Sequence, residues 1–525
     1  MTLTELAKGR LTLPLILFVA TVLSRLPFAS RMLFHMDSVQ YALALKQYDI
    51  GLHQPHPPGY FVYVVLGRMM QWIVPDPNMA FVSLSILFTA GTVIVVYLLA
   101  RALFDDRSAL ISAVFAMTSP NLWFYGEIAM NYGLESFFSA AIAYACWQVH
   151  TRKDARYLAV LVILLGLSGG VRQNTPVFLF PLVLYACKEM PLRSLLLAIL
   201  ALCAVSLGWF VPMLVSTGGW EAYRGAFHEL LQFHVGPQSV FETGVAKLVL
   251  HARALITFLV YGMGGGFVLL LFSFYVMVRR CAFDDMRRDL LSFFACWIAP
   301  AFCFYLFVVI HPGNPGHVLV IMPPFFILLT QALRYLHQEL SALLPWQWHR
   351  TMVLLVVSTN LYIFLASELQ VSSRFIRAHD HNLQAIISRF RAFNPENTVL
   401  FITPYSYYGF RHIMYYVPEY FVCSPQLIGM KGQKRVYFAG MNRETIRMDT
   451  ITIPPKIDTF ASLAMNSDTN GMHDSSGIRI DVVNQESYVF SGSITHALRL
   501  FPDLPLKIGQ DIAIRYTGNG GNHPL

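Results

Sequence analysis

A carboxylate and an arginine stand where this sequence passes from apolar to polar segments. Asp37 lies early in a long segment between two apolar runs, residues 30–79, two positions after His35. Arg172 lies in the turn SGGVRQN between two short apolar segments. A carboxylate can take the proton of an attacking hydroxyl group, and an arginine can hold a leaving phosphate through two parallel hydrogen bonds. Ionisable residues at membrane depth are costly, so both residues are candidates for function.

Further polar candidates lie near the ends of other apolar runs, where we expect them to line a cavity and to contact an acceptor or a cation. They are Glu127 and Glu135 in WFYGEIAMNYGLESFF, His53 and His56 in HQPHPPGY, and His311 and His317 in HPGNPGH. No two of these histidines are four residues apart on one helix, the spacing that puts two metal ligands on one face. A divalent cation is therefore possible but not required, its ligands are unknown, and no other cofactor is expected.

Each candidate also has a purely structural interpretation. Asp37 precedes a helix-like run and Gln40 follows three residues later, which is the pattern of a helix N-cap with a capping box. His56, which precedes Pro-Pro-Gly, could simply end a loop and start a helix. Glu135 could be a satisfied polar group inside a helix bundle, and Glu127 could be solvated at the surface. Arg172 could be a side chain that reaches the membrane interface.

The composition indicates a membrane protein. The chain has 525 residues, of which 55% are hydrophobic and 13% are charged, whereas a soluble protein has about 25% charged residues. Charged residues make up 11% of residues 1–367 and 18% of residues 368–525. We therefore predict a transmembrane domain over 1–367 and a soluble domain over 368–525. The net charge of +8 fits basic loops between apolar segments better than nucleic-acid binding.

About eleven apolar segments are predicted as membrane spans, although several are shorter than the roughly 20 residues that a span needs. With the N-terminus inside, the inner loops hold 15 lysines and arginines and the outer segments up to residue 367 hold eight, which predicts an N-in, C-out topology. Three glycines, residues 264–266, lie inside one span and are expected to allow close helix packing. The spans lie near residues 11–29, 80–100, 108–120, 134–149, 157–168, 173–187, 194–214, 254–278, 290–310, 318–335 and 351–367.

Two predicted outer loops are long, residues 30–79 and 215–253, and loops of this size usually carry function. Residues 60–74 and the run WEAYRGAFHELLQF have the pattern of amphipathic helices at a membrane interface. The tail begins with a helical stretch to about residue 392 and then alternates short β-rich runs with turn residues. These runs are TVLFIT, RVYFAG, IRIDVV, YVFSGS and DIAIRY, and they predict a small α+β domain outside the membrane.

The order of short motifs resembles a known family. An early Asp in the first outer loop is followed by PHPPGYF, by the basic inner loop RALFDDRSALISAVF and by MTSPNLWFYGEIAMNYGLES. Over residues 10–330 this order is similar to that of the C-type (GT-C) membrane glycosyltransferases. Within them it resembles the protein O-mannosyltransferase and lipid A aminoarabinose transferase superfamily. The runs GGVRQNTPVFLFPL and HPGNPGHVLVIMPPF fit bacterial members of that group.

The resemblance implies roles for three residues. Asp37 matches the acidic residue that is the family's proposed catalytic base, although Asp-Ser stands here where many members have Asp-Glu. Glu135 matches an acidic position, often Asp, that shapes the acceptor or cation site, and Arg172 falls where a basic residue faces the donor phosphate. Family members use isoprenoid-phosphate sugars, commonly invert the anomeric centre, and act on the periplasmic or luminal face. This implies a bacterial inner-membrane protein with its C-terminal domain outside the cytoplasm.

Sequence and resemblance together predict a glycosyltransferase that moves a sugar from a polyprenyl phosphate to a hydroxyl group of a glycan, lipid or protein. Its partners would be that donor, membrane lipid and the acceptor, and no nucleic acid. Two other classes stay open. A transporter or flippase for a lipid-linked sugar would show inverted repeats or charges within its spans, and a non-catalytic scaffold would only bind lipid. The long outer loops and short inner loops favour the enzyme.

Overall fold

The structure is a computed structural model in which the chain forms two compact units. The first unit combines residues 1–30 with 58–215 and 224–376, and the second combines 31–57 and 216–223 with 377–525. The predicted division at residue 367 kept all of loop 30–79 with the transmembrane domain, whereas the structure groups residues 31–57 with the tail. The structure describes residues 12–279, 288–340, 347–402, 409–428, 436–441, 444–448, 451–453, 459–465, 479–482, 487–493 and 506–508.

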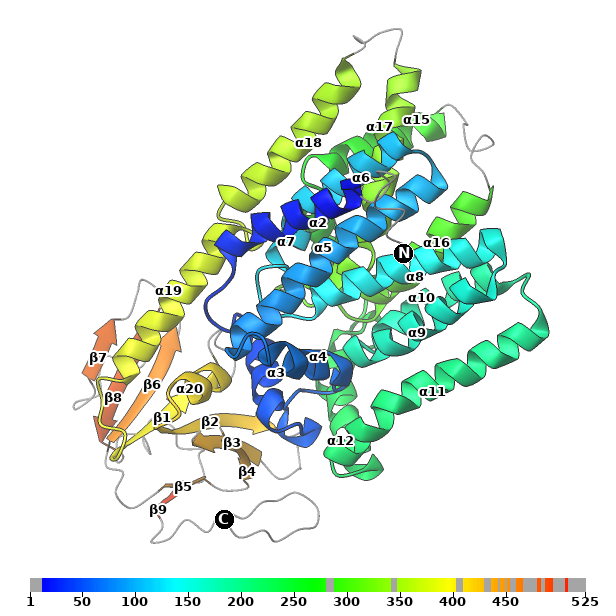
Figure 1. Cartoon of the computed structure of the whole chain (residues 1–525). Helices are drawn as coiled ribbons and strands as arrows, with labels where there is room; N and C mark the ends of the chain where they lie inside the picture. Colours follow the sequence, from blue (N-terminus) through cyan, green and yellow to red (C-terminus); the bar gives the residue numbers. More distant parts are fainter. Residues whose placement is uncertain are drawn as a thin grey trace. The chain divides into compact units, whose positions relative to one another are not determined.

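The first unit is built of helices, which Figure 1 shows from α2 in blue to α18 in yellow-green. In chain order they are α2 (Thr12–Arg25), η1 (Leu26–Phe28), α4 (Phe61–Gln71), α5 (Pro77–Leu103), α6 (Asp106–Thr118), α7 (Pro120–Phe124), α8 (Tyr132–Arg152), α9 (Ala155–Val171), α10 (Asn174–Cys187), α11 (Leu192–Ser216), α12 (Trp220–Leu230, which starts in the second unit), η3 (Leu231–Val235), η4 (Gly236–Gln238), α13 (Val240–Thr243), α14 (Val245–Met263), α15 (Gly266–Arg279), α16 (Arg288–Phe307), η6 (Pro315–Val320), α17 (Met322–Glu339) and α18 (Trp348–Leu365). Every predicted span overlaps at least one of them, and the two predicted amphipathic helices are α4 and α12.

Four of the described helices are both long and apolar enough to cross a membrane: α5, α11, α14 and α16. The others that overlap predicted spans are shorter or less apolar, as several of the apolar segments in the sequence already indicated. The structure thus has the apolar helices of a membrane protein. The number of spans and the N-in, C-out orientation stay predictions.

The packing of α5 against α8 positions the first turn of α8. α5 begins at Pro77, where the missing proline N–H costs nothing, and Asp76 caps it by accepting the N–H of Met79. Gly133 lies so close to α5 that a Cβ atom there would stand 2.9 Å from Cγ2 of Thr89. Only glycine allows this approach, so the start of α8, which carries Glu135, is held against α5.

The predicted span 254–278 is wrong as a single helix, because α14 ends at Met263 and α15 begins at Gly266. Gly264 lies between them with φ +54° and ψ −132°, a backbone conformation that is open mainly to glycine. A Cβ atom on Gly264 would lie 2.2 Å from Oδ1 of Asn360, and one on Gly266 would lie 2.5 Å from Cδ2 of Leu329. The glycines therefore allow close packing, as predicted, and they also break the helix.

Replacing Gly264 by alanine is expected to destabilise the protein by more than about 1 kcal/mol, because both the backbone conformation and the nearby Asn360 oppose a Cβ atom. Thermal unfolding of the purified protein in detergent measures the change. Gly208→Ala is the matched control, since Gly208 lies inside α11 and a Cβ atom there would have nothing within 4 Å. The control should unfold at or slightly above the wild-type temperature, and equal losses in the two variants would contradict the steric explanation.

The second unit contains a mixed β-sheet with helices from two distant parts of the sequence. Its sheet has seven strands in the order β4-β3-β2-β1-β6-β8-β7, and β5 pairs with β9 in a second, two-stranded sheet. The elements are α3 (Met36–Lys46), η2 (Ile50–Leu52), α19 (Ser373–Phe390, which starts in the first unit), β1 (Thr398–Ile402), α20 (Phe410–Tyr416), β2 (Phe421–Ile428), β3 (Val436–Met441), β4 (Glu444–Met448), β5 (Ile451–Ile453), β6 (Thr459–Met465), β7 (Arg479–Val482), β8 (Ser487–Ser493) and β9 (Leu506–Ile508).

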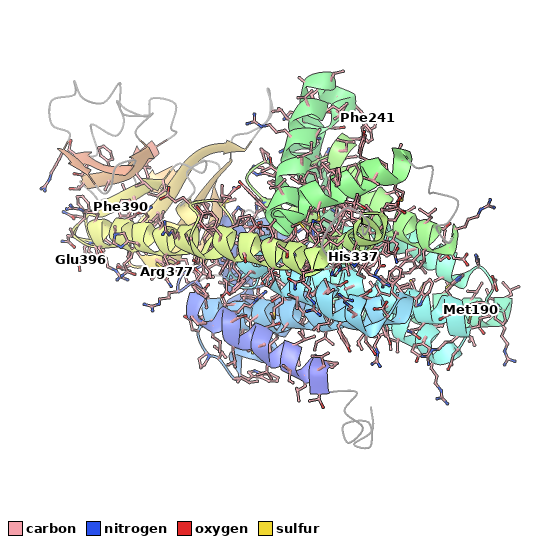
Figure 2. The ribbon with its side chains drawn as sticks, turned by 90° about the horizontal axis from the view of Figure 1, so that it is seen from above. Met190, Phe241, His337, Arg377, Phe390 and Glu396 are labelled. Carbon is pink, nitrogen blue, oxygen red and sulfur yellow. The ribbon has the colours of Figure 1, made fainter. Side chains whose placement is uncertain are left out.

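Strand β1 is the centre of this sheet, and all five of its residues are buried. It runs parallel to β2 and to β6, while the outer pairs are antiparallel. Helix α20 connects β1 to β2, as a parallel pair of strands requires, and α20 packs on α3. Four predicted β-rich runs form β1, β3, β7 and β8, and the fifth, DIAIRY, lies outside the described residues. The predicted helical stretch is α19, along which Figure 2 labels Arg377 and Phe390.

Candidate active site

Asp37 lies in the first turn of α3, in the second unit. The N-cap of α3 is His35, whose Nδ1 accepts the backbone N–H of Asp37 at 3.2 Å, while Oγ of Ser38 accepts the N–H of His35 at 3.2 Å. The interpretation in which Asp37 itself caps the helix and Gln40 completes the box is therefore wrong. The helix cap does not use the Asp37 carboxylate, whose oxygens lie near His35 and His56.

Two histidines flank the Asp37 carboxylate. Oδ2 lies 3.4 Å from Nδ1 of His35, and Oδ1 lies 3.7 Å from Nδ1 of His56. The side chains of Asp37 and His56 are each 19% exposed, so this carboxylate is partly shielded yet still open to solvent. Burial lowers the pKa of His35, but the charge of Asp37 and its hydrogen bond outweigh burial and raise that pKa above the ordinary value. The Asp37 carboxylate thus favours the protonated form of His35.

Gln40 holds the second histidine in place. Its Oε1 lies 2.6 Å from Nδ1 of His56, one turn of α3 beyond Asp37. Since residues three apart share a helix face, Asp37 and Gln40 both face the His56 ring, and Tyr41 lies against it at 6.0 Å between ring centroids. His56 is more than the end of a loop, because it attaches the HQPHPPGY segment to the helix that carries Asp37.

His53 lies at the end of the short helix η2, three residues before His56. It ends η2 in the left-handed conformation, with φ +55°, and its backbone N–H donates to the carbonyl of Ile50. Asp49 caps the same turn by accepting the N–H of Gly51 and forms a β-bridge with Gln54. His53 thus has a described role in the turn, and its predicted role in a cavity stays a prediction.

Arg172 and Glu135 form an ion pair in the first unit. Nε of Arg172 lies 3.3 Å from Oε2 of Glu135, which is fully buried, and the Arg172 side chain is 11% exposed. Oγ1 of Thr175 donates to Oε1 of Glu135 at 3.2 Å. The start of α8 is held to the end of α9 by Nδ2 of Asn131, which donates to the carbonyl of Val171. Glu135 is therefore a partnered polar group inside the bundle, in agreement with its structural interpretation.

An aromatic group surrounds this pair. The guanidinium carbon of Arg172 lies 4.4 Å from the ring centroid of Tyr132, in cation–π geometry. The ring of His317 lies 5.9 Å from that of Tyr132 and 5.4 Å from that of Tyr305. Asn314, in the turn HPGNPGH, accepts from Oη of Tyr125 and donates to Oη of Tyr132, each at 2.7 Å. These hydrogen bonds hold the turn near the start of α8. The same turn places the ring of His317 beside Tyr132 and Tyr305.

The two remaining candidates are Glu127 and His311. Glu127 is fully buried, and neither of its carboxylate oxygens has a hydrogen-bond partner of normal geometry among the described residues. Burial raises the pKa of Glu127 well above its ordinary value, although the charge of Arg25 and the indole of Trp123 act against this. Surface solvation of Glu127 is therefore wrong. His311 is exposed, and its Nδ1 accepts the backbone N–H of Gly313.

The structure groups the predicted residues into two sets. Asp37 and His56 lie together in the second unit, and Glu135, Arg172 and His317 lie together in the first. Within the described part of the chain, no cluster of three His, Cys, Asp or Glu side chains is arranged to hold a metal ion. The residues that support the two sets were not predicted from the sequence, and they are Gln40, Tyr132, Tyr305, Asn314 and His35 in its capping role. Their signals in the sequence were the runs NYGLES and HPGNPGH and the helical spacing of Asp37 and Gln40.

Known proteins share this arrangement of helices. Residues 47–191 match the family model described as the N-terminal domain of the protein O-mannosyl-transferase TMEM260. The crystal structure of ArnT from Cupriavidus metallidurans bound to undecaprenyl phosphate has a TM-score of 0.55 and 11% identity, over 92% of this chain and 98% of that one. The apo state of ArnT gives a TM-score of 0.53 at the same identity and coverage. No curated protein matches the sequence in a direct comparison.

The chain is therefore a protein with apolar helices and the fold of the GT-C membrane enzymes, since the likeness to ArnT extends over nearly all of both chains. The predicted resemblance to the GT-C glycosyltransferases is confirmed in this form. It includes a protein O-mannosyltransferase match over residues 47–191, within the range that the sequence motifs indicated. A bacterial origin stays a prediction.

Proposed function

We propose that this protein is an integral-membrane glycosyltransferase that moves a sugar from a polyprenyl phosphate to a hydroxyl acceptor on the outer face of the plasma membrane. The ArnT fold and the O-mannosyl-transferase match over residues 47–191 support the reaction class. The undecaprenyl phosphate bound to ArnT supports the class of donor. The acceptor is proposed to be a hydroxyl compound, which can be a glycan, a lipid or a protein.

The surroundings of the Asp37 carboxylate are the observation that carries the proposal. A general base must be ionised, reachable and held in place, and the Asp37 carboxylate is partly exposed with an imidazole nitrogen near each of its oxygens. In the proposed step, the acceptor oxygen forms a bond to the anomeric carbon as the bond from that carbon to the phosphate oxygen breaks. The hydroxyl proton passes to Asp37, and the bonding electron pair leaves with the lipid phosphate. Attack from the face opposite to the phosphate inverts the anomeric centre.

Arg172 is proposed to stabilise the leaving phosphate. A guanidinium group has five N–H donors, so its ion pair with Glu135 through Nε does not exhaust its capacity. The buried partner and the Tyr132 ring hold the group in a fixed orientation before any ligand arrives. A charge that is oriented in advance stabilises a developing phosphate anion without a further reorganisation cost. His317, beside Tyr132 and Tyr305, is proposed to shape the same part of the first unit.

The experiment uses the full chain in nanodiscs with a panel of radiolabelled polyprenyl-phosphate sugars and simple hydroxyl acceptors, with and without EDTA. We expect one donor class to release free lipid phosphate together with a glycosylated product, and the EDTA arm tests the optional divalent cation. Direct binding of each radiolabelled donor is measured in parallel. If no donor binds and none turns over, the proposed function is wrong, and a lipid-binding scaffold or a transporter becomes the better interpretation.

A further inference from the structure

One ring nitrogen of His35 serves two groups of Asp37 that need it in opposite states. Nδ1 of His35 lies 3.2 Å from the backbone nitrogen of Asp37, which donates to it, and 3.4 Å from the carboxylate oxygen Oδ2. A ring nitrogen accepts a hydrogen bond through its lone pair and donates one only when it carries a proton. The helix cap therefore requires an unprotonated Nδ1, and the ion pair with the carboxylate requires a protonated one.

We propose that His35 is a positioning residue for Asp37, which exchanges the cap of α3 for an ion pair with the carboxylate when it takes up a proton. In its neutral form, His35 orders the first turn of α3 and directs a lone pair near Oδ2, which keeps Asp37 basic. In its protonated form, it stabilises the carboxylate and so makes Asp37 a weaker base. This inference rests on the proposed role of Asp37 as the base.

His56 has the opposite, constant role. Its Nδ1 lies 2.6 Å from Oε1 of Gln40 and 3.7 Å from Oδ1 of Asp37. An ionised carboxylate only accepts hydrogen bonds, so the tautomer with a proton on Nδ1 suits both neighbours, and a neutral His56 already directs an N–H toward them. His56 thus needs no change of charge to support Asp37, whereas His35 does.

Two other histidines face His35 from other elements, and they are harder to protonate than His35. A positive charge on His35 lowers the pKa of His379 in α19 and of His412 in α20. Burial lowers the pKa of His379, although its neighbour Asp380 acts against this, and burial lowers the pKa of His412 to about 3, with the two other imidazoles adding to the effect. Both rings therefore stay neutral near pH 7. Of these three imidazoles, His35 alone lies beside Asp37 with a raised pKa.

Two variants of His35 separate its role as the N-cap of α3 from the effect of its charge. Asparagine is a good N-cap residue and does not titrate, whereas alanine neither caps a helix well nor titrates. The dependence of kcat/KM on pH is measured for wild type, His35→Asn and His35→Ala, together with their melting temperatures. Wild-type activity is expected to rise two- to tenfold through an ionisation above pH 6.5. His35→Asn should lose this step and keep the wild-type melting temperature, and His35→Ala should lose both. An unchanged step in His35→Asn would overturn the proposal.

A second measurement does not depend on turnover. Diethyl pyrocarbonate modifies neutral imidazoles, and mass spectrometry of the full-length protein follows the modification of His35 at each pH. The midpoint for His35 should lie above 6.5 and should fall in Asp37→Asn, while the exposed His381 serves as an internal reference. An equal midpoint in the two proteins would overturn the proposed ion pair. A shifted midpoint in a protein without glycosyltransferase activity would instead reject the proposed function and leave the contact between His35 and Asp37 standing.

Discussion

Asp37→Asn lowers the turnover of the polyprenyl-phosphate donor by about 10²–10⁴-fold, the usual contribution of a general base, and leaves the protein folded. The amide has nearly the size of the carboxylate but cannot take the acceptor proton. Stability should change little, because the cap of α3 uses the backbone N–H of Asp37 and not its side chain. Release of radiolabelled lipid phosphate measures the first effect, and thermal unfolding in detergent measures the second.

Asp154→Asn is the matched control for this experiment. Asp154 also lies at a helix start, where its side chain accepts the N–H of Arg156 and caps α9. Asparagine caps a helix about as well as aspartate, and Asp154 belongs to a short loop that the sequence predicts to be cytoplasmic. Its variant should match the wild type in both measurements. Turnover in Asp37→Asn within a few-fold of wild type would remove Asp37 as the base.

Glu135→Gln destabilises the protein by about 3–5 kcal/mol, the cost of leaving one charge of a buried pair without its partner. Glu135 is fully buried, and Arg172 is nearly so. The glutamine can still accept from Thr175, so the loss reports on the missing charge and not on a missing shape. The melting temperature of the purified protein measures the effect. Adding Arg172→Met should recover most of the loss, because the isolated cation is then removed.

An exposed ion pair provides the control. Lys153, at the end of α8, pairs with Glu189, between α10 and α11, and their side chains are 54% and 51% exposed. Since exposed pairs contribute about 0–1 kcal/mol, Glu189→Gln should unfold close to the wild-type temperature. If Glu135→Gln unfolds no more easily than Glu189→Gln, the pair with Arg172 does not hold the start of α8. A double variant that loses as much as both single variants together would show that the two residues act independently.

Local patterns predicted most helices because each depends on residues close in sequence. Long apolar runs bounded by polar caps, such as α5 after Asp76 and Pro77, indicate their own position. The same logic fails at Gly264, where hydropathy continues through a helix break. Apolar composition does not distinguish one long helix from two short ones, since the break depends on a backbone conformation and on the approach of Asn360.

The sequence by itself determined the class of protein, the apolar helices and the family resemblance, and it singled out Asp37, Glu135 and Arg172 as unusual polar residues. Tertiary structure alone decided their partners. His35 caps α3, Gln40 holds His56 next to Asp37, and Glu135 pairs with Arg172 across 37 positions of the chain. The reason is physical: hydropathy and capping depend on near neighbours, whereas an ion pair or a hydrogen bond depends on where packing brings distant segments together.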